Sequence, residues 1–306
     1  MSNRTFIALG TASQVPTRRR NHNGYFLRWD EEGLLFDPGE GTQRQMTFGG
    51  VSASEITKIF ITHFHGDHCL GLAGIIQRIS LDRVPHTVEI YYPASGQKFI
   101  ENLSEASIFH NMAKLKYCPF DKRGVIFQGK KFSIHTEELD HGVDCWGYRL
   151  QEHDDRSFDK AKLAQAGLKG PIVGQLKREG QVEVDGKVIT LEEVSDFKPG
   201  QSMAFVMDTR LCKGAYELAK HVDLLVCEST YLNSEEKDAF SNGHMTAAHA
   251  AKVAQEAGAR KLILTHFSGR YTSIEPFVEE ASVIHPNVVA VNDGDRVDVP
   301  KREQPS

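Results

Sequence analysis

The residues best suited to chemistry lie close together between Thr62 and His68. Three imidazoles and one carboxylate, from His63, His65, Asp67 and His68, follow the spacing H-x-H-x-D-H. Imidazole nitrogens suit zinc, and the neighbouring carboxylate allows one loop to serve two metal ions. A solvated polar turn is the alternative, but such turns seldom have this spacing. The motif therefore predicts a metal site.

The segments on either side indicate how this motif is held. Residues 59–61 are apolar and favour a strand, and residues 70–79 carry apolar side chains at helical spacing. The pattern predicts a turn between a strand and a helix, with the ligands presented at the carboxyl end of the strand.

Polar residues also follow three apolar segments in the second half of the chain. Residues 204–207 lead to Asp208, residues 224–227 to Glu228, and residues 262–264 to His266. Each polar residue could merely mark the end of a strand. Together they predict buried strands whose carboxyl ends meet at one edge of packed sheets.

Further candidates follow apolar runs elsewhere. Asp37 comes after residues 34–36, in a turn rich in glycine, and it could hydrogen-bond to a metal-binding histidine, because ligating imidazoles need a partner for their other nitrogen. His141 follows a strand expected over residues 132–135, although a lone histidine is more often structural. His135, inside that strand, is the weaker candidate.

Length and composition describe an ordinary globular chain. The 306 residues allow one large domain or two small ones, and 40% are hydrophobic and 25% charged. No apolar run approaches the roughly 18 residues that cross a bilayer, and the apolar stretch at residues 6–9 is too short for a signal peptide. We therefore expect a cytoplasmic protein without a membrane segment.

The cysteines also favour a reducing compartment. They are odd in number and form no C-x-x-C pair, which argues against a disulfide framework and a zinc finger. The five are Cys69, Cys118, Cys145, Cys212 and Cys227.

The net charge gives no sign of a nucleic-acid partner. It is −5, with a pI near 6.3, whereas RNA-binding proteins usually have a basic surface. The compact basic run is Arg18-Arg19-Arg20, which could be no more than an exposed turn. Any contact with RNA would therefore be local.

The remaining pattern is less regular. In residues 153–200 apolar periodicity weakens and charges alternate, which predicts a long excursion with short elements of its own. Elsewhere we expect strands at residues 5–9 and 88–92, a helical region at 97–115, helices at 247–257 and 274–284, and a disordered tail from Lys301. His244 precedes the helix at 247–257, which Gly258 caps.

Taken together, these segments resemble the metallo-β-lactamase superfamily of binuclear zinc hydrolases, and within it the ribonuclease Z family. The likeness runs from about Phe6 to about Val299 and includes DPGEGTQ at residues 37–43, GPIVGQLK at 170–177 and SGRY at 268–271. Met245 stands where the family usually has a small polar residue. The resemblance implies an α/β fold, an αββα sandwich forming one domain over residues 1–306, with an inserted flexible arm at 153–200.

The resemblance also implies roles for individual residues. Asp67 would orient or deprotonate the attacking water, and His244, oriented by Glu228, would protonate the leaving group. The implied zinc ligands are His63, His65 and His141 for one ion and Asp67, His68 and His266 for the other, with Asp208 bridging both. The implied substrate contacts are Arg18, Arg20, Asn21, Gly170, Pro171, Gly174, Lys177, Ser268 and Arg270.

The activity implied is that of a homodimeric enzyme with two zinc ions per chain. It would remove the 3′ trailer from precursor tRNA, leaving a 3′-hydroxyl on the tRNA and a 5′-phosphate on the trailer. A hydrolase of small phosphodiesters or thioesters is an alternative, against which the arm motif and the Glu228–His244 pair argue. A non-catalytic RNA-binding protein is another, but all the expected ligand positions are filled.

Overall fold

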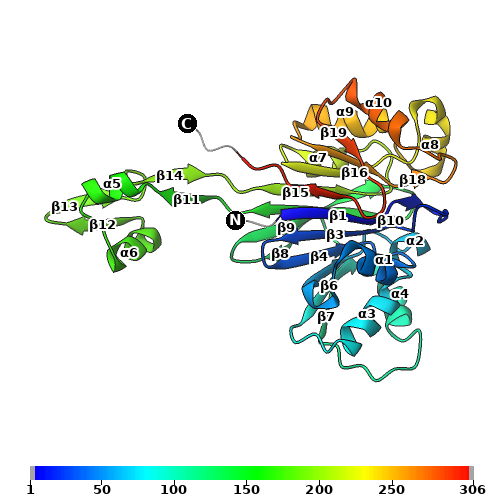
Figure 1. Ribbon diagram of the computed structural model, residues 1–306, viewed down its shortest axis with the longest axis horizontal. Helices are drawn as coiled ribbons and strands as arrows, with labels where there is room; N and C mark the ends of the chain where they lie inside the picture. Colours follow the sequence, from blue (N-terminus) through cyan, green and yellow to red (C-terminus); the bar gives the residue numbers. More distant parts are fainter. Residues whose placement is uncertain (1–3, 303–306) are drawn as a thin grey trace.

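Two β-sheets pack face to face, and helices cover both outer faces (Figure 1). The computed structural model describes residues 4–302. This arrangement confirms the αββα sandwich expected from the sequence. Among the described residues, none of the helices is both long and apolar enough to span a bilayer.

The first sheet has seven strands and carries the N-terminal half of the chain. Strands β4 to β7 run parallel, so their carboxyl ends share one edge. In spatial order the strands are β20 (Arg296–Asp298), β1 (Arg4–Gly10), β3 (Gly24–Trp29), β4 (Glu32–Phe36), β5 (Lys58–Phe60), β6 (Val88–Pro93) and β7 (Leu115–Phe120).

The second sheet also has seven strands and is parallel from β15 to β19. It brings the expected strands before Asp208, Glu228 and His266 side by side. In spatial order its strands are β19 (Val288–Ala290), β17 (Leu262–Thr265), β16 (Leu224–Glu228), β15 (Ser202–Val206), β10 (Asp144–Glu152), β9 (Phe132–Asp140) and β8 (Gly124–Gln128).

Aromatic side chains fill the space between the sheets. The rings of Phe36 and Phe205 lie 4.7 Å apart, and Phe60 lies 5.0 Å from both Phe36 and Tyr148. Alternate strand residues face opposite sides of a sheet, so the strand side chains that do not point between the sheets pack against the outer helices. Close-packed aromatic pairs are worth about 0.5–1.5 kcal/mol each beyond burial, so this layer fixes the two sheets rigidly against one another.

Helices form the two outer layers. The helix at Leu72–Leu81 packs Ile75, Ile76 and Ile79 on the first sheet, and the helix at Ala247–Ala257 packs a stripe of alanines on the second. On the first sheet lie α1 (Thr42–Gly49), α3 (Leu72–Leu81) and α4 (Gln97–Ser104); on the second lie α7 (Lys213–Ala219), α9 (Ala247–Ala257) and α10 (Glu275–Ser282). Short elements near the sheet edges are α2 (Gly66–Cys69), α8 (Glu236–Asn242), η1 (Ala53–Glu55), η2 (Ala94–Gly96), η3 (Asn233–Glu235) and the pair β2 (Ala12–Ser13) with β18 (Phe267–Ser268).

Some expected elements were wrong. The helical region expected at residues 97–115 ends at Ser104, and β7 begins at Leu115. The residues between are mostly exposed, Ile108 fully so, and without an apolar face to bury they gain nothing from continuing the helix. Helices α1, α7 and α8 were not expected. The expected disordered tail is held in place as far as Arg302, because the guanidinium of this residue pairs with buried Asp223 at 2.9 Å. Residues 303–306 lie outside the described chain.

Residues 155–198 extend away from the sandwich as an arm (Figure 1). A two-stranded stalk carries a tip with its own small core, which includes Leu168, Leu176, Val182 and Ile189. The stalk strands are β11 (Asp155–Phe158) and β14 (Ser195–Lys198), and the tip contains α5 (Lys160–Gln165), α6 (Pro171–Glu179), β12 (Gln181–Val184) and β13 (Lys187–Thr190).

The root of the arm is fixed to the sandwich by Arg4. Its guanidinium donates to Glu152, the last residue of β10, to Gln201, which directly precedes β15, and to Asp30. It also lies 4.4 Å from the ring of Trp29. The arm therefore starts from a rigid point even though its tip is remote from the main core.

Candidate active site

Strand ends from both sheets place the expected ligands together. The turn after β5 carries His63 to His68, β9 leads to His141, β15 to Asp208 and β17 to His266. Asp208 and His266 have positive φ angles of 45° and 63°, and Asp37, after β4, has 42°. Such backbone conformations are unfavourable for these residues and cluster at functional sites, because the surrounding fold must hold them.

One group of ligand atoms converges from the first motif and His141. Nδ1 of His65 lies 3.0 Å from Nε2 of His63 and 3.2 Å from Nε2 of His141. Oδ2 of Asp208 lies 3.7 Å from Nε2 of His63 and 3.4 Å from Nε2 of His141. These four side chains could hold one metal ion.

The second group of ligand atoms also lies around the carboxylate of Asp208. Oδ2 of Asp67 lies 3.4 Å from Nε2 of His68 and 3.8 Å from Nε2 of His266. Oδ2 of Asp208 lies 3.2 Å from Nε2 of His68, and Oδ1 of Asp208 lies 3.1 Å from Nε2 of His266. Asp208 is thus placed between both groups, as a bridging ligand must be.

The bonds behind the histidines show which nitrogens face the centre. Nδ1 of His63 donates to Thr62 Oγ1 at 3.0 Å, that of His141 to Gly243 O at 2.8 Å, and that of His266 to Thr230 Oγ1 at 2.8 Å. With the proton on Nδ1, the lone pair of Nε2 is directed into the cluster. The backbone at Gly243 has φ of 79°, and a Cβ there would lie 2.8 Å from His141 Nδ1, so only glycine fits.

Asp37 supports the same arrangement. It is fully buried, accepts from Nδ1 of His68 at 2.8 Å and from both the backbone N–H and the hydroxyl of Thr62. Asp37 thus makes the hydrogen bond to a candidate ligand histidine that the sequence led us to expect.

Buried atoms without partners test whether a cation fits. Oδ1 of Asp208 and Nε2 of His266 are buried and have no hydrogen bond within the described chain, although they lie 3.1 Å apart. A buried polar atom left unpaired costs about 1–3 kcal/mol. A cation between the two groups would satisfy both atoms, so the donor set fits a metal.

The carboxylates are ionised and available as ligands. Burial alone would raise the pKa of Asp208, but the neighbouring imidazoles of His266 and His68 outweigh it and lower that pKa well below the usual range. Burial would also raise the pKa of Asp67, but the neighbouring His68 outweighs burial and lowers the pKa of this carboxylate. Burial lowers the pKa of His63 well below its ordinary value, which favours the neutral, metal-binding imidazole.

His244 lies beside this cluster and is paired with Glu228. Nδ1 of His244 is 3.0 Å from Oε1 of Glu228, a fully buried carboxylate that also accepts from Thr209 N and Thr230 Oγ1 at 2.6 Å. Burial lowers the pKa of His244, but the Glu228 charge outweighs it and raises that pKa to about 9. His244 could also join Asp208 and His266 around a metal ion, so its role needs a direct test.

An open cleft of about 750 Å³ exposes the cluster to solvent. Ser268 and Arg270 line it; Arg270 pairs with Asp238 at 3.1 Å and lies over the ring of Tyr231. A phosphate in the cleft would have to compete with Asp238 for this guanidinium.

The other loop residues expected at the substrate divide into two kinds. Arg18 is exposed. Arg20 is buried, donates to Tyr271 O at 3.0 Å and lies over Phe267, and Asn21 donates its side-chain amide to Glu40 O at 2.7 Å. Arg20 and Asn21 do not line the cleft; they shape the loop, because their polar groups already have partners inside the protein.

The expected arm contacts lie around α6, far from α2 and β18, whose residues line the cleft (Figure 1). Gly170 precedes this helix with φ of 66° and ψ of −140°, a conformation essentially confined to glycine, and Pro171 starts it. Gly174 lies within the helix, and Lys177 pairs with Asp155 at 3.0 Å.

Two contributors to the site were missed. The backbone N–H of Gln14 donates to Oδ2 of Asp67 at 2.8 Å, and Thr230 links Glu228 to His266. A backbone donor carries no side-chain signal in a sequence. Thr230 does follow a strand end, two residues after Glu228, and that position could have identified it.

Cys69 adjoins His68 but is not among the grouped ligands. Its side chain packs in the core beneath the first sheet, and burial raises the pKa of the thiol to about 12, so it is protonated. We expect Cys69→Ser to retain its metal and most of its activity, measured by elemental analysis and turnover. The buried hydroxyl costs about 1–3 kcal/mol, so a lower melting temperature is compatible with this outcome. Cys69→Ala controls for polarity; loss of metal in both variants would show that a thiolate coordinates.

The fold and the site define a protein of the metallo-β-lactamase superfamily. The family model described as "Metallo-beta-lactamase superfamily" matches residues 17–148, and that described as "Beta-lactamase superfamily domain" matches residues 183–267. The solved structure of human tRNase Z, short form, superposes with a TM-score of 0.71, covering 97% of this chain and 100% of that one. At 24% identity that likeness bears on the fold alone.

Curated relatives give the family. Ribonuclease Z of Nocardia farcinica (strain IFM 10152) is 51% identical over 304 residues, which are 99% of this chain and 100% of that protein. Ribonuclease Z of Chlamydia trachomatis serovar D (strain ATCC VR-885 / DSM 19411 / UW-3/Cx) is 46% identical over 301 residues, covering 98% and 99%. The chain belongs to the ribonuclease Z family.

Proposed function

We propose that this protein is an endoribonuclease that removes the 3′ trailer from precursor tRNA. The observation that carries this proposal is the match to ribonuclease Z over nearly the whole chain, arm included. The grouping of seven candidate ligand side chains, four of which line one cleft, supports it. A hydrolase of small phosphodiesters is less well supported, because such a substrate would give the arm no role.

The proposed cofactor is two zinc ions per chain. His63, His65 and His141 would hold one and Asp67, His68 and His266 the other, with Asp208 shared. Imidazole and carboxylate donors suit zinc. When bound, such an ion pair lowers the pKa of bound water and offsets negative charge on a phosphate.

Side chains around the cleft would have separate roles in the reaction. Asp67, held by the Gln14 N–H, would orient or deprotonate the attacking water. His244 would give a proton to the departing 3′-oxygen, while Glu228 keeps the imidazole oriented and charged. The tRNA would then carry a 3′-hydroxyl and the trailer a 5′-phosphate.

The proposed setting is a homodimer in a reducing cytoplasm. The five cysteines are free, and apolar side chains such as Leu81, Ile108 and Met112 are exposed near α3, where a second copy could cover them. Light scattering of the purified protein would measure the mass in solution.

A gel assay with a 3′-extended precursor tRNA tests the activity. Cleavage after the acceptor end should give the two termini stated above, should stop on chelation, and should return when zinc is added. Products ending in a 2′,3′-cyclic phosphate, or no cleavage with metal restored, would contradict the proposal.

The arm gives a prediction that separates binding from chemistry. Its tip has its own core and its root is fixed by Arg4, so residues 155–198 can be replaced with a short Gly/Ser linker without opening the sandwich. We expect precursor-tRNA cleavage to be lost through weaker binding, while hydrolysis of a small activated phosphodiester continues. Metal content serves as the folding control. If both activities fell equally, the arm would be structural.

A further inference from the structure

Two further pockets lie around the loop at residues 16–20. One, of about 370 Å³, lies between this loop and α1, and the other, of about 760 Å³, lies between the loop and residues 271–275. Both are lined by Thr17 and by Arg18 to Arg20, and the second shares Gly269 with the cleft. The larger pocket therefore borders the cleft at Gly269, and the smaller pocket borders the larger one at the loop.

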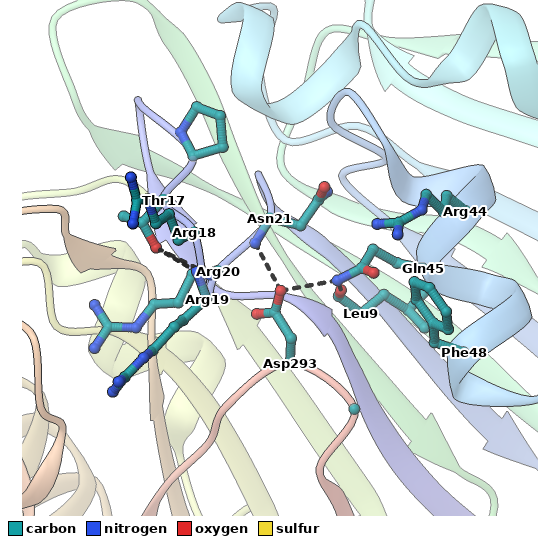
Figure 2. Close-up of a pocket in the computed structure, with 12 residues that line it drawn as sticks. Leu9, Thr17, Arg18, Arg19, Arg20, Asn21, Arg44, Gln45, Phe48 and Asp293 are labelled. Carbon is teal, nitrogen blue, oxygen red and sulfur yellow. Dashed lines mark hydrogen bonds between the residues drawn. The ribbon is translucent and has the colours of Figure 1, made fainter.

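The pocket beside α1 has a fixed shape. Figure 2 shows Asp293 between the loop and the helix, and its carboxylate accepts from Asn21 N at 2.6 Å and from Gln45 Nε2 at 2.8 Å. It also accepts from Thr11 Oγ1 at 2.8 Å. Asp293 is thus occupied within the protein and holds the loop against the helix. We call this hollow, lined by Arg18, Arg19, Arg44, Gln45 and Phe48 among others, the α1 pocket.

Its lining combines an exposed ring with cations that have no carboxylate partner within residues 4–302. Arg44 lies 4.6 Å from the ring of Phe48, which is 65% exposed and plays no part in the core. The guanidinium groups of Arg18, Arg19 and Arg44 form no ion pair with any residue between 4 and 302, whereas Arg270, for example, is paired. On a chain of net charge −5, this concentration of free positive charge is local.

This chemistry suits unpaired nucleotides. Exposed aromatic rings stack on bases, and guanidinium groups bind phosphates, and proteins that bind single-stranded nucleic acid combine the two. A duplex would satisfy the cations but not the ring, because its base faces are already stacked. In a precursor tRNA the unpaired segment beyond the cleaved bond is the trailer.

We propose that the α1 pocket binds nucleotides of the 3′ trailer, with a base stacked on Phe48 and phosphates held by Arg18, Arg19 and Arg44. This inference rests on the proposed function. It predicts that trailers long enough to reach the pocket bind more tightly than a trailer of one nucleotide.

The test compares precursor tRNAs that differ only in trailer length. Phe48→Leu keeps an apolar side chain but removes the stacking face, so it should raise KM for the long-trailer substrate roughly 5- to 150-fold, the range for one lost base stack. KM for the one-nucleotide trailer should not change, and Phe48→Trp should restore long-trailer binding. Inhibition by the free 5′-phosphorylated trailer should weaken in Phe48→Leu as well.

The arginines give a second readout. Arg18→Ala and Arg44→Ala should each flatten the salt dependence of long-trailer binding, by about 0.7 in the logarithmic slope for each phosphate that is no longer neutralised. Lys252→Ala, which removes an exposed cation from α9, is the matched control and should change neither substrate. If the pocket variants bound both precursor tRNAs more weakly to the same extent, the pocket would contact the acceptor stem. If they bound both like the parent, the pocket would not contact the substrate. Either result overturns the proposal. Failure of the parent protein to cleave either substrate would instead overturn the proposed function.

Discussion

Asp208→Ala is expected to lose both metal ions and nearly all activity. The Asp208 carboxylate lies between the two groups of ligands, with its oxygens 3.1–3.4 Å from nitrogens of His68, His141 and His266. Removing even a residue that only hydrogen-bonds to a metal ligand typically costs 10–100-fold, so removing a shared ligand should exceed about 100-fold. Elemental analysis and precursor-tRNA turnover measure the two effects on the same preparation.

A conservative variant separates charge from backbone strain. Asp208 has a φ of 45°, which asparagine tolerates better than alanine, so Asp208→Asn keeps the shape and removes only the negative charge. We expect it to lose metal as well. Asp121→Ala, in an exposed loop, controls for the loss of one carboxylate and should behave like the parent. Full metal content and activity in Asp208→Ala would rule out a shared binuclear centre.

His244→Ala should slow precursor-tRNA cleavage about 10²–10⁴-fold, the usual worth of general acid catalysis. The departing 3′-oxygen is an alkoxide that needs a proton, and Glu228 raises the pKa of His244 to about 9, so the imidazole carries one at neutral pH. A nitrophenyl phosphodiester departs as a stable phenolate. The same variant should therefore hydrolyse this substrate near the parent rate, with its metal retained.

Two controls distinguish the acid role from other roles of His244. His249, in the first turn of the same α9 helix, also faces a carboxylate, Glu236 at 3.2 Å, but lies away from the cleft. His249→Ala should cleave precursor tRNA like the parent, so a defect shared by both variants would indicate a disturbed helix start. Loss of metal in His244→Ala would make His244 a ligand, and equal slowing of both substrates would exclude proton donation.

The sequence by itself determined the elements that carry the site. Apolar runs ending in Asp208, Glu228 and His266 predicted strands with polar residues at their carboxyl ends, and each strand is present. The H-x-H-x-D-H motif placed its ligands within six residues, so local geometry alone brings them near one another. Such signals survive in a sequence because they depend on short-range periodicity, which neighbouring residues impose together.

Tertiary structure decided which side chains have free groups and which are already used. Arg18 and Arg20 belong to one basic run, yet Arg18 is exposed and Arg20 is buried against Phe267 and the carbonyl of Tyr271, 251 residues away in the chain. The N–H of Gln14 reaches Asp67 across 53 residues, and a backbone group leaves no trace in residue type. These contacts depend on how two sheets close over one core, so no local pattern encodes them.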